Sequence, residues 1–598
     1  MPRQWAEPKL LRMVEALRHE SFYTTGTWVD ESLGVYVGWI AHENSFCDGM
    51  PLCNERGDVA LVFSGEEYPE PGVASGLKQR GHELSPEGPS YLVHLYEDDH
   101  SFPAGLNGRF HGLVIDRTRK TATLFNDRYA MHRLCYHESK ESFYFAAEAK
   151  AILAVGPAEL RTASPRSLGE FVACGYVLEN RTSFAHIHLL PPASAWVFGN
   201  GTLEGKHSYF QRRDWEDQAP LEPESYYQQL RETFARNLPR YCNGQERMGM
   251  SLTGGLDTRA VMACQKIPSG SLPCYTFGGM YRECRDVILA RRVASLCGQS
   301  HDVITVGDDF LSHFAHYAER TVYLSDGSVD VSRAPDLYAN ERARKIAPVR
   351  LTGLYGDEVT RHLRTFKPVE PAPDLFRPEL LSHVRQARTT YNDLLREHPL
   401  SFAVFRQAPW TQSGSLALEQ TQVTMRTPFL DNDFVRTVFR APAAASTNND
   451  LRARLIRDSS PALGQIRTDL GFGGRSDNVA AAANRLLLKF TFKAEYAYDY
   501  GMPQWVARVD HLFSQIHLER LFLGRHKFYH FRVWYRDALA EYVRQILLDR
   551  RTLSRPYINR PMLEAVVQGH LKGDRNYTTS IHKVLTLELL HRLFLDSQ

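Results

Sequence analysis

A cluster of hydroxyl, glycine and acidic residues follows a short apolar run near the middle of the chain. The apolar run is Met248 to Leu252, the cluster is Thr253 to Thr258, and helix-forming residues continue from Arg259. This order predicts a strand, a tight loop and a helix. Paired glycines let backbone N–H groups approach an anion, and the start of the helix adds partial positive charge. The loop therefore predicts a phosphate site, although a Gly-Gly turn between a strand and a helix also occurs without a ligand.

The side chains of this loop suggest individual roles. The hydroxyls of Thr253 and Thr258 can donate to phosphate, and Asp257 can hold a magnesium ion. No Gly-Lys-Ser/Thr follows the glycines, so this is not a Walker loop. The candidate nucleotide-binding residues of this stretch are Leu252, Thr253, Gly254, Gly255, Leu256, Asp257 and Thr258.

Two further apolar runs and a helix follow the loop in alternating order. Residues 272–279 and 301–306 are the strand-like runs, and residues 286–298 form an apolar-periodic helix that ends at a glycine. Alternating strands and helices predict a doubly wound parallel sheet. Ligands of such sheets bind at the carboxyl ends of the strands, which is where the phosphate-type loop stands.

The first third of the chain has a different pattern. After an amphipathic helix at residues 8–18, strand-like runs dominate. They occupy residues 33–40, 59–63, 110–116, 122–125 and 142–145. Many short strands with few helices predict a layered β-rich domain over residues 1–205. We expect the parallel-sheet domain over residues 206–598, with a helical C-terminal part from about residue 480.

The amino-acid sequences of several segments resemble those of class B asparagine synthetases. The stretch from Thr253 to Thr258 resembles the Ser-Gly-Gly-x-Asp-Ser loop of ATP pyrophosphatases, with threonine for both serines. Residues 108–116, 126–136 and 145–153 resemble the glutaminase domain of the same family. The resemblance implies an N-terminal domain of the Ntn-hydrolase type. It also implies a synthetase domain that uses ATP and Mg²⁺ to move AMP onto a carboxylate.

The resemblance assigns roles to a second loop. Thr352 to Glu358 is similar to the family's Ser-Gly-Glu-Gly-x-Asp-Glu, whose aspartate coordinates magnesium together with the aspartate of the first loop. We therefore expect Asp357 to share a magnesium ion with Asp257. Two carboxylates from separate strand ends suit that ion, and a charge at a helix start is the alternative for Asp357. The other nucleotide contacts carried over are Gly279, Thr352 and Gly353.

Two positions of the synthetase-like part depart from the family. Leu354 stands where the family has a glutamate, and Tyr355 beside it is our candidate catalytic residue. Asp469 occupies the place of a lysine that neutralises charge developing on the acyl-adenylate. Arg467 is the candidate substitute and Arg475 the alternative, although solvated arginines are the commoner interpretation of both.

Two more segments are similar to the family in amino-acid sequence. Gly471 to Gly473 is similar to its Lys-x-Gly-Phe loop, and the segment that ends at Asp431 is similar to one that ends in Pro-Phe-Leu-Asp. In the second segment we expect Arg426 and Asp431 to fix a helix and its cap rather than to contact substrate.

The glutaminase-like part lacks the residues that the resemblance requires. A working glutaminase of this family needs a cysteine after the initiator methionine, an arginine and an aspartate for the glutamine α-groups, and an asparagine for the oxyanion. Pro2 follows the methionine, and Ala41 to Phe46 stand in place of the arginine-bearing strand. Ser64 replaces the asparagine and Gly88 the aspartate. We expect this domain to hydrolyse no glutamine and to act as a scaffold.

Bulk properties narrow the class of partner. The net charge of +2 gives no basis for a nucleic-acid or anionic-membrane partner. The sequence has no run of 18 apolar residues, and its start lacks the apolar core of a signal peptide. The nine cysteines include no C-x-x-C motif and predict neither a disulfide framework nor a zinc site. This pattern favours a cytoplasmic location, where thiols stay reduced. Whether the protein forms a homodimer is left open by the sequence.

These patterns together predict an ATP- and magnesium-dependent ligase that forms an amide. The expected substrate is a small-molecule or peptide carboxylate, and the expected nucleophile is ammonia or an amine of the substrate. One alternative is internal amide formation, as in the β-lactam synthetases and lasso-peptide cyclases that resemble the same family. Another is a catalytically silent scaffold. Other pyrophosphatase-loop enzymes remain compatible with the first loop alone.

Overall fold

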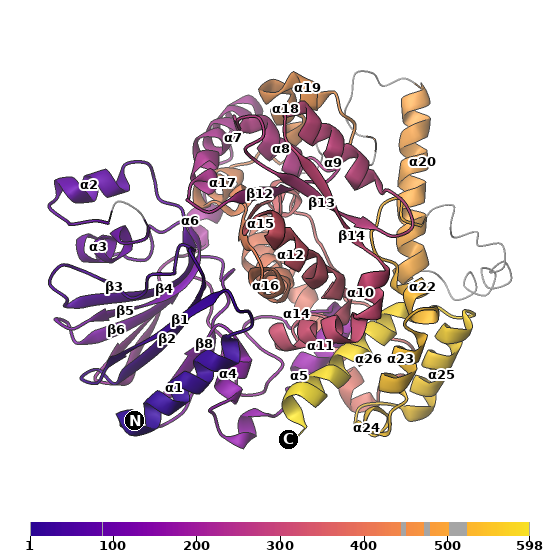
Figure 1. The fold of residues 1–598 in the computed structure, drawn as a ribbon, viewed down its shortest axis with the longest axis horizontal. Coiled ribbons are helices and arrows are strands. Elements are labelled where there is room, and N and C mark those ends of the chain that lie inside the picture. Colours follow the sequence, from indigo (N-terminus) through magenta and orange to yellow (C-terminus); the bar gives the residue numbers. More distant parts are fainter. Residues whose placement is uncertain are drawn as a thin grey trace.

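Two sheets of opposite type organise the chain. The structure, a computed structural model, describes residues 2–85, 88–443, 450–469, 471, 479–501 and 523–596. A six-stranded antiparallel sheet forms the centre of the N-terminal part, and a five-stranded parallel sheet that of the following part (Figure 1). This confirms the predicted fold class, α/β with a β-rich Ntn-type domain before a doubly wound parallel sheet.

The antiparallel sheet is covered by helices on one face and by a hairpin on the other. Its strands, in spatial order, are β11 (Thr202–Ser208), β10 (Ser194–Gly199), β6 (Thr121–Asn126), β5 (Gly108–Asp116), β4 (Val59–Glu67) and β3 (Leu52–Cys53). Along β4, Leu61 and Phe63 pack under helices α2 (Val73–Gln79) and α3 (Tyr91–Asp98). Ala60 and Val62 point the other way, because successive side chains of a strand alternate between faces.

The opposite face of this sheet is closed by the hairpin β1 (Tyr23–Asp30) and β2 (Val35–His42). Helix α1 (Arg3–Leu17) lies on the outer side of the hairpin, where Gly38 leaves room for Val14. The result is a helix–sheet–hairpin–helix layering, visible at the indigo end of the chain (Figure 1). The strands predicted within residues 33–40, 59–63, 110–116, 122–125 and 142–145 are all present.

The second sheet is parallel throughout. Its strands, in spatial order, are β14 (His301–Val306), β13 (Cys274–Gly279), β12 (Met248–Ser251), β15 (Val349–Leu351) and β16 (Thr424–Arg426). The chain therefore starts in the middle, moves out to one edge and returns to the other. Because β12 and β15 are neighbours, the loops that follow them emerge side by side at the carboxyl edge.

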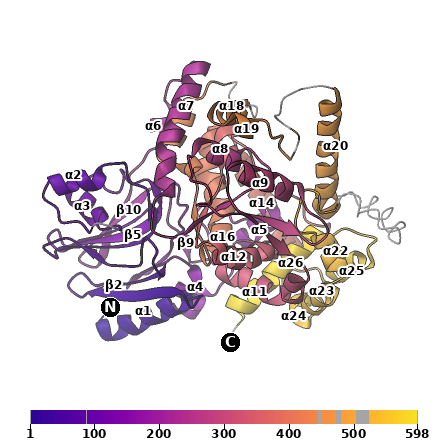
Figure 2. The ribbon, with the colours of Figure 1, turned by 45° about the horizontal axis from the view of Figure 1, so that its top comes forward.

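The C-terminal part is helical within the described ranges, as predicted. Its longest helices are α20 (Val479–Tyr496), α25 (Arg560–Lys572) and α26 (Thr578–Leu590). Helix α26 is buried along most of its length, whereas α20 stands at the outer edge of the molecule, on the side away from α1 (Figures 1 and 2). Every described helix is too short or too polar to cross a bilayer, and all nine cysteines, which fall in described ranges, are free thiols.

A buried carboxylate ties the two sheets together. Asp431 is fully buried and accepts hydrogen bonds from Asn107 Nδ2 (2.9 Å) in the N-terminal domain, and from Asn237 Nδ2 (2.6 Å) and Tyr241 Oη (3.0 Å) in the second domain. It also caps helix α17 (Asn432–Val438) through two backbone N–H groups. The predicted capping role of Asp431 is therefore confirmed, and the same carboxylate joins both domains.

We predict that Asp431→Ala destabilises the whole chain. The substitution removes a helix cap worth about 1 kcal/mol and leaves buried donors without an acceptor at roughly 1–3 kcal/mol each. We therefore expect the free energy of unfolding to fall by about 3 kcal/mol or more, measured by urea denaturation followed by fluorescence. Arg436→Ala, an exposed position on the same helix, is the control, and an equal effect of both changes would contradict the assignment.

Candidate active site

The first predicted loop lies at the carboxyl edge of the parallel sheet. Leu252 is buried and continues β12 through its N–H to Tyr275 O (2.9 Å), and helix α8 (Asp257–Cys264) begins at the predicted aspartate. The loop is braced internally, because the N–H groups of Thr253 and Gly255 donate to the Oγ1 atoms of Thr258 (3.4 Å) and Thr253 (3.3 Å), respectively. Strand, loop and helix are thus arranged as the sequence predicts.

Glycines of the second loop let it touch the first. A Cβ at Gly353 would stand 2.4 Å from the backbone nitrogen of Thr258, and one at Gly356 would stand 2.3 Å from Asp257 Cγ. Any larger residue at either position would push the loops apart. On the side of β16, Thr352 N donates to Arg426 O (3.0 Å), which holds the second loop from behind.

A single arginine joins the two predicted aspartates. Arg452, on helix α18 (Asp450–Ser459), donates Nη1–H to Asp257 Oδ1 and Nη2–H to Asp357 Oδ1. Its side chain is only 4% exposed, and Arg361 Nη1 adds a further hydrogen bond to Asp357 Oδ1 (3.1 Å). Asp257 and Asp357, far apart in the sequence, therefore bond to the same guanidinium.

Burial sets the protonation of this acidic group. Desolvation raises the pKa of Asp257 to about 6, with Arg452 lowering it and Asp357 raising it. Glu358, next in the chain, is half-buried, and desolvation together with the charges of Asp257 and Asp357 raises its pKa to about 7. Three neighbouring carboxyl groups thus share the positive charge of two arginines, Arg452 and Arg361.

Sequence reasoning missed Arg452 and the burial of Glu358. Arg452 belongs to an arginine-rich helical stretch, Leu451 to Arg457, whose pattern is that of an exposed amphipathic helix. Nothing in that pattern distinguishes the arginine that turns inward. For Glu358 the signal was the adjacent Asp357, because consecutive acids at a helix start lie close to the same loop.

Additional acidic residues lie against the first loop. Gly254 N donates to Oδ1 of the half-buried Asp286 (2.7 Å), and a Cβ on Gly254 would be 3.2 Å from Asp469 Cβ. Burial and the nearby charge of Asp469 raise the pKa of Asp286 to about 6. Asp469, which occupies the place of the family's lysine, therefore adds negative charge next to the turn.

The region that follows the loops holds the predicted Arg467. Its backbone oxygen accepts a hydrogen bond from Arg259 Nη2 (3.5 Å), and the same Arg259 atom donates to Gly254 O (3.0 Å). Arg467 thus lies one buried arginine away from the first loop, and its catalytic role stays a prediction. Arg475 and residues 472–473 of the predicted glycine loop lie outside the described residues.

Two further predicted site residues are packed against other parts of the chain. Tyr355 is buried at the junction of the two domains, where it lines a small cavity with Tyr129 and Tyr241, and its catalytic role stays a prediction. A Cβ on Gly279 would lie 2.7 Å from Phe528 O, so the close approach at this glycine is made by the chain itself. The nucleotide contact predicted for Gly279 stays a prediction.

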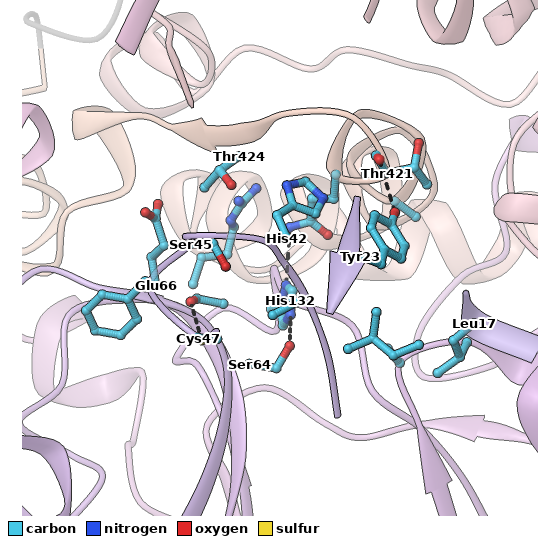
Figure 3. Close-up of a pocket in the computed structure, with 18 of the residues that line it drawn as sticks. Leu17, Tyr23, His42, Ser45, Cys47, Ser64, Glu66, His132, Thr421 and Thr424 are labelled. Carbon is cyan, nitrogen blue, oxygen red and sulfur yellow. Dashed lines mark hydrogen bonds between the residues drawn. The ribbon is translucent and has the colours of Figure 1, made fainter. Parts of the chain in front are cut away.

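A second cavity, of about 170 Å³, lies between the N-terminal domain and residues 417–424 (Figure 3). His42 and Ser64, two of the positions where the sequence departs from a working glutaminase, line it together with Cys47 and His132. Gly88 is not among the described residues of this lining. Two of the positions at which the sequence departs from the family's glutaminase thus lie in the lining of one cavity.

Three polar side chains of this cavity, Cys47, Ser64 and His132, are held in hydrogen bonds. Cys47 Sγ donates to Gly65 O (3.0 Å), and burial raises the pKa of its thiol well above the ordinary value. Burial lowers the pKa of His132, so its ring is neutral. Gln420 Nε2 donates to His132 Nδ1 (3.2 Å), which leaves the ring proton on Nε2, where it is donated to Ser64 Oγ (2.9 Å). His132 in this arrangement cannot take a proton from Ser64.

Comparisons with known proteins agree with the two-domain architecture. A family model described as a glutamine amidotransferase domain matches residues 2–210, and one described as asparagine synthase matches residues 229–460. The chain is 20% identical over 388 residues to asparagine synthetase [glutamine-hydrolyzing] 1 of Bacillus subtilis (strain 168), and the match covers 63% of this chain and 60% of that protein. Asparagine synthetase [glutamine-hydrolyzing] 2 of the same organism is 24% identical over 222 residues, or 36% of this chain and 30% of that protein. These matches thus span less than two thirds of either relative's length.

A solved structure, glutamine phosphoribosylpyrophosphate amidotransferase from B. subtilis complexed with ADP and GMP, is also similar to part of the chain. It is 10% identical, with a TM-score of 0.22, and the match covers 45% of this chain and 66% of that one.

We predict that Arg452→Gln strengthens magnesium binding. The arginine and a divalent cation compete for the same two aspartate oxygens, so its removal frees both. At pH 8, above the raised pKa values of Asp257 and Glu358, we expect an affinity gain of about tenfold, or roughly 1.4 kcal/mol, by isothermal titration calorimetry with Mg²⁺ alone.

Arg454→Gln, on the same helix and paired with Glu224 at the surface, is the matched control and should leave the affinity unchanged. Equal affinity of the wild type and Arg452→Gln would show that the aspartates do not bind the ion.

Proposed function

The chain belongs to the asparagine synthetase family, and we propose that it is an ATP-dependent ligase that activates a carboxylate and transfers an amine to it. The observation that supports this most strongly is the meeting of two strand-end loops. It gathers Asp257 and Asp357 on one guanidinium beside a Thr-Gly-Gly turn. Such a site suits a triphosphate accompanied by a divalent cation.

The residues present fit a magnesium ion. Carboxylate oxygens are the ligands that Mg²⁺ prefers, and one oxygen of each aspartate already points to a common cation. Asp257 and Asp357 would hold the ion, with the Glu358 carboxylate nearby. When bound, magnesium supplies positive charge that neutralises and orients phosphate oxygens. Arg452, released from the aspartates, would then be a donor for phosphate.

The triphosphate would lie along the first loop. The hydroxyls of Thr253 and Thr258 and the backbone N–H of Gly255, which now bond to one another within the loop, would turn to the phosphates, and α8 contributes the positive end of its dipole. Leu252 and Leu256 position this stretch, and Thr352 with Gly353 would border it from the second loop.

Activation of a carboxylate explains why a nucleotide is needed. A carboxylate is a poor electrophile, so its oxygen attacks the α-phosphorus of ATP and pyrophosphate leaves with the electrons of the broken P–O bond. An amine then attacks the acyl carbon, AMP departs, and the amine loses a proton to its surroundings. The cations around the loop stabilise the negative charge that develops on the phosphate oxygens during the first attack.

The acids beside the loop favour a second candidate, internal amide formation. Asp469 stands where the family has a lysine, and the half-buried Asp286 adds negative charge beside it. Negative charge attracts an ammonium group and disfavours an acyl substrate that carries several free carboxylates. A substrate that holds its own amine and one carboxylate would fit this environment better than free aspartate does.

A third candidate, a catalytically silent scaffold, rests on the internal pairing of the site. Arg452 supplies the cation for both aspartates, and Asp286 occupies the N–H of Gly254. A protein of this kind would need neither nucleotide nor magnesium.

The proposed ligase predicts ATP–pyrophosphate exchange that depends on Asp257. With Mg²⁺ and a panel of carboxylates, from aspartate to amine-bearing peptides, the wild-type chain should return labelled pyrophosphate to ATP. Asp257→Asn keeps an acceptor for Arg452 but loses a magnesium ligand, so the rate should drop by about 100-fold or more.

Asp393→Asn, at an exposed helix position, is the control and should retain the wild-type rate. Exchange with peptides but not with aspartate would favour internal amide formation. If no member of the panel supports exchange and ATP does not bind, the scaffold candidate stands instead.

For the N-terminal domain we propose that it hydrolyses no glutamine. The purified chain, supplied with glutamine, ATP and Mg²⁺, should release no glutamate above the non-enzymatic rate, because the Cys47 thiol is buried and its pKa is raised. A parallel reaction with ammonium chloride in place of glutamine shows whether a lack of product reflects a missing carboxylate acceptor rather than a missing supply of ammonia. Glutamate release that disappears in Cys47→Ser would overturn this proposal.

A further inference from the structure

Four potential metal ligands meet at the outer side of the N-terminal domain, away from the loops of the parallel sheet. Glu55 lies in the turn between β3 and β4, and His82 follows α2. His94 and Glu97 lie one turn apart on α3. These elements form the outer helical layer over the antiparallel sheet (Figure 1).

Their ligand atoms are already gathered at coordination range. One nitrogen or oxygen of each residue lies within 4.8 Å of the others. His94 Nδ1 is 2.9 Å from Glu97 Oε2 and 3.8 Å from Glu55 Oε2, and His82 Nδ1 is 3.8 Å from Glu97 Oε2. Ligands at roughly 2.0–2.2 Å from a tetrahedral zinc ion stand about 3.3–3.6 Å from one another. Since all the separations are below 4.8 Å, side-chain shifts on the order of 1 Å would close the shell.

The other polar atom of three of these ligands is fixed by a neighbour. His82 Nε2 is 3.0 Å from Asp98 Oδ1, which orients the imidazole so that Nδ1 faces the cluster. Glu97 Oε1 accepts from Asn54 Nδ2 (2.7 Å), and Glu55 Oε1 accepts from the backbone N–H of residue 83 (2.7 Å). Carboxylate-oriented histidines and hydrogen-bonded carboxylates are characteristic of protein metal sites.

Charge and burial also favour a divalent ion. The rings of His82 and His94 lie 4.6 Å apart, and the side chain of His94 is only 2% exposed. A divalent ion held between the rings would balance the negative charge of the Glu55 and Glu97 carboxylates.

We propose that Glu55, His82, His94 and Glu97 form a zinc-binding site. Two imidazole nitrogens and two carboxylate oxygens suit Zn²⁺, and four protein ligands make a closed, structural shell. The ion would fasten α3 and the segment after α2 to the β3–β4 turn, and so hold the outer helices on the sheet. The cysteine pattern gave no sign of this site, because none of its ligands is a cysteine and they come from three separate segments.

The test uses the full-length chain with any affinity tag removed. After incubation with ZnCl₂ and desalting, elemental analysis should find about one zinc per chain. The cobalt-substituted protein should show the visible absorption of a four-coordinate Co²⁺ ion, and zinc should raise the thermal midpoint. None of these readouts depends on ligase activity.

Variants locate the ion. His94→Ala and His82→Ala should each lose the cobalt spectrum and most of the zinc. Because His94 is buried, Glu55→Gln in the exposed turn provides a second check that does not disturb the core. His100→Ala, an exposed histidine close to the end of α3, is the control and should keep one zinc, as in the wild type. A wild-type chain with less than about a tenth of a zinc per chain, or full zinc retention in all three ligand variants, would overturn the proposal.

Discussion

The central constraint on this structure is the repulsion between two carboxylates that arrive from neighbouring strands. Asp257 and Asp357 can share a half-buried site only if a cation joins them, and the buried Arg452 supplies that cation. The glycines at 353 and 356 let the loops approach, and the docking of α18 brings the arginine. Such a site is suited to a cation of higher charge, such as a divalent metal ion, because the acceptor atoms are in place before the ion binds.

The N-terminal domain contributes to this site through packing, whatever its own chemistry. Arg426 forms a buried ion pair with Glu66 of β4, and its backbone oxygen holds the N–H of Thr352 at the start of the second loop. Strand β16 thus connects the antiparallel sheet to the loop that carries Asp357. The N-terminal domain therefore contacts the strand that holds this loop, independently of any glutaminase activity.

The sequence predicted what depends on local pattern and on sheet topology. The strand, loop and helix around Thr253 follow from residue type, and Asp357 lies beside Asp257 because their strands are adjacent and parallel. The capping role of Asp431 was predictable from its family context. Contacts between remote segments were not. Arg452 looks like any surface arginine in a helix, Tyr355 is directed toward the domain junction by its surroundings, and Phe528 reaches Gly279 from 249 residues further along the chain.

The most direct test of this account is an experimental structure with Mg²⁺ and a non-hydrolysable ATP analogue. It should place the triphosphate along residues 253–258, with the metal between Asp257 and Asp357 and Arg452 moved away from both carboxylates. If Arg452 still spans the two aspartates at saturating analogue, and no nucleotide contacts the loop, the site is a structural salt bridge and the ligase proposal is wrong.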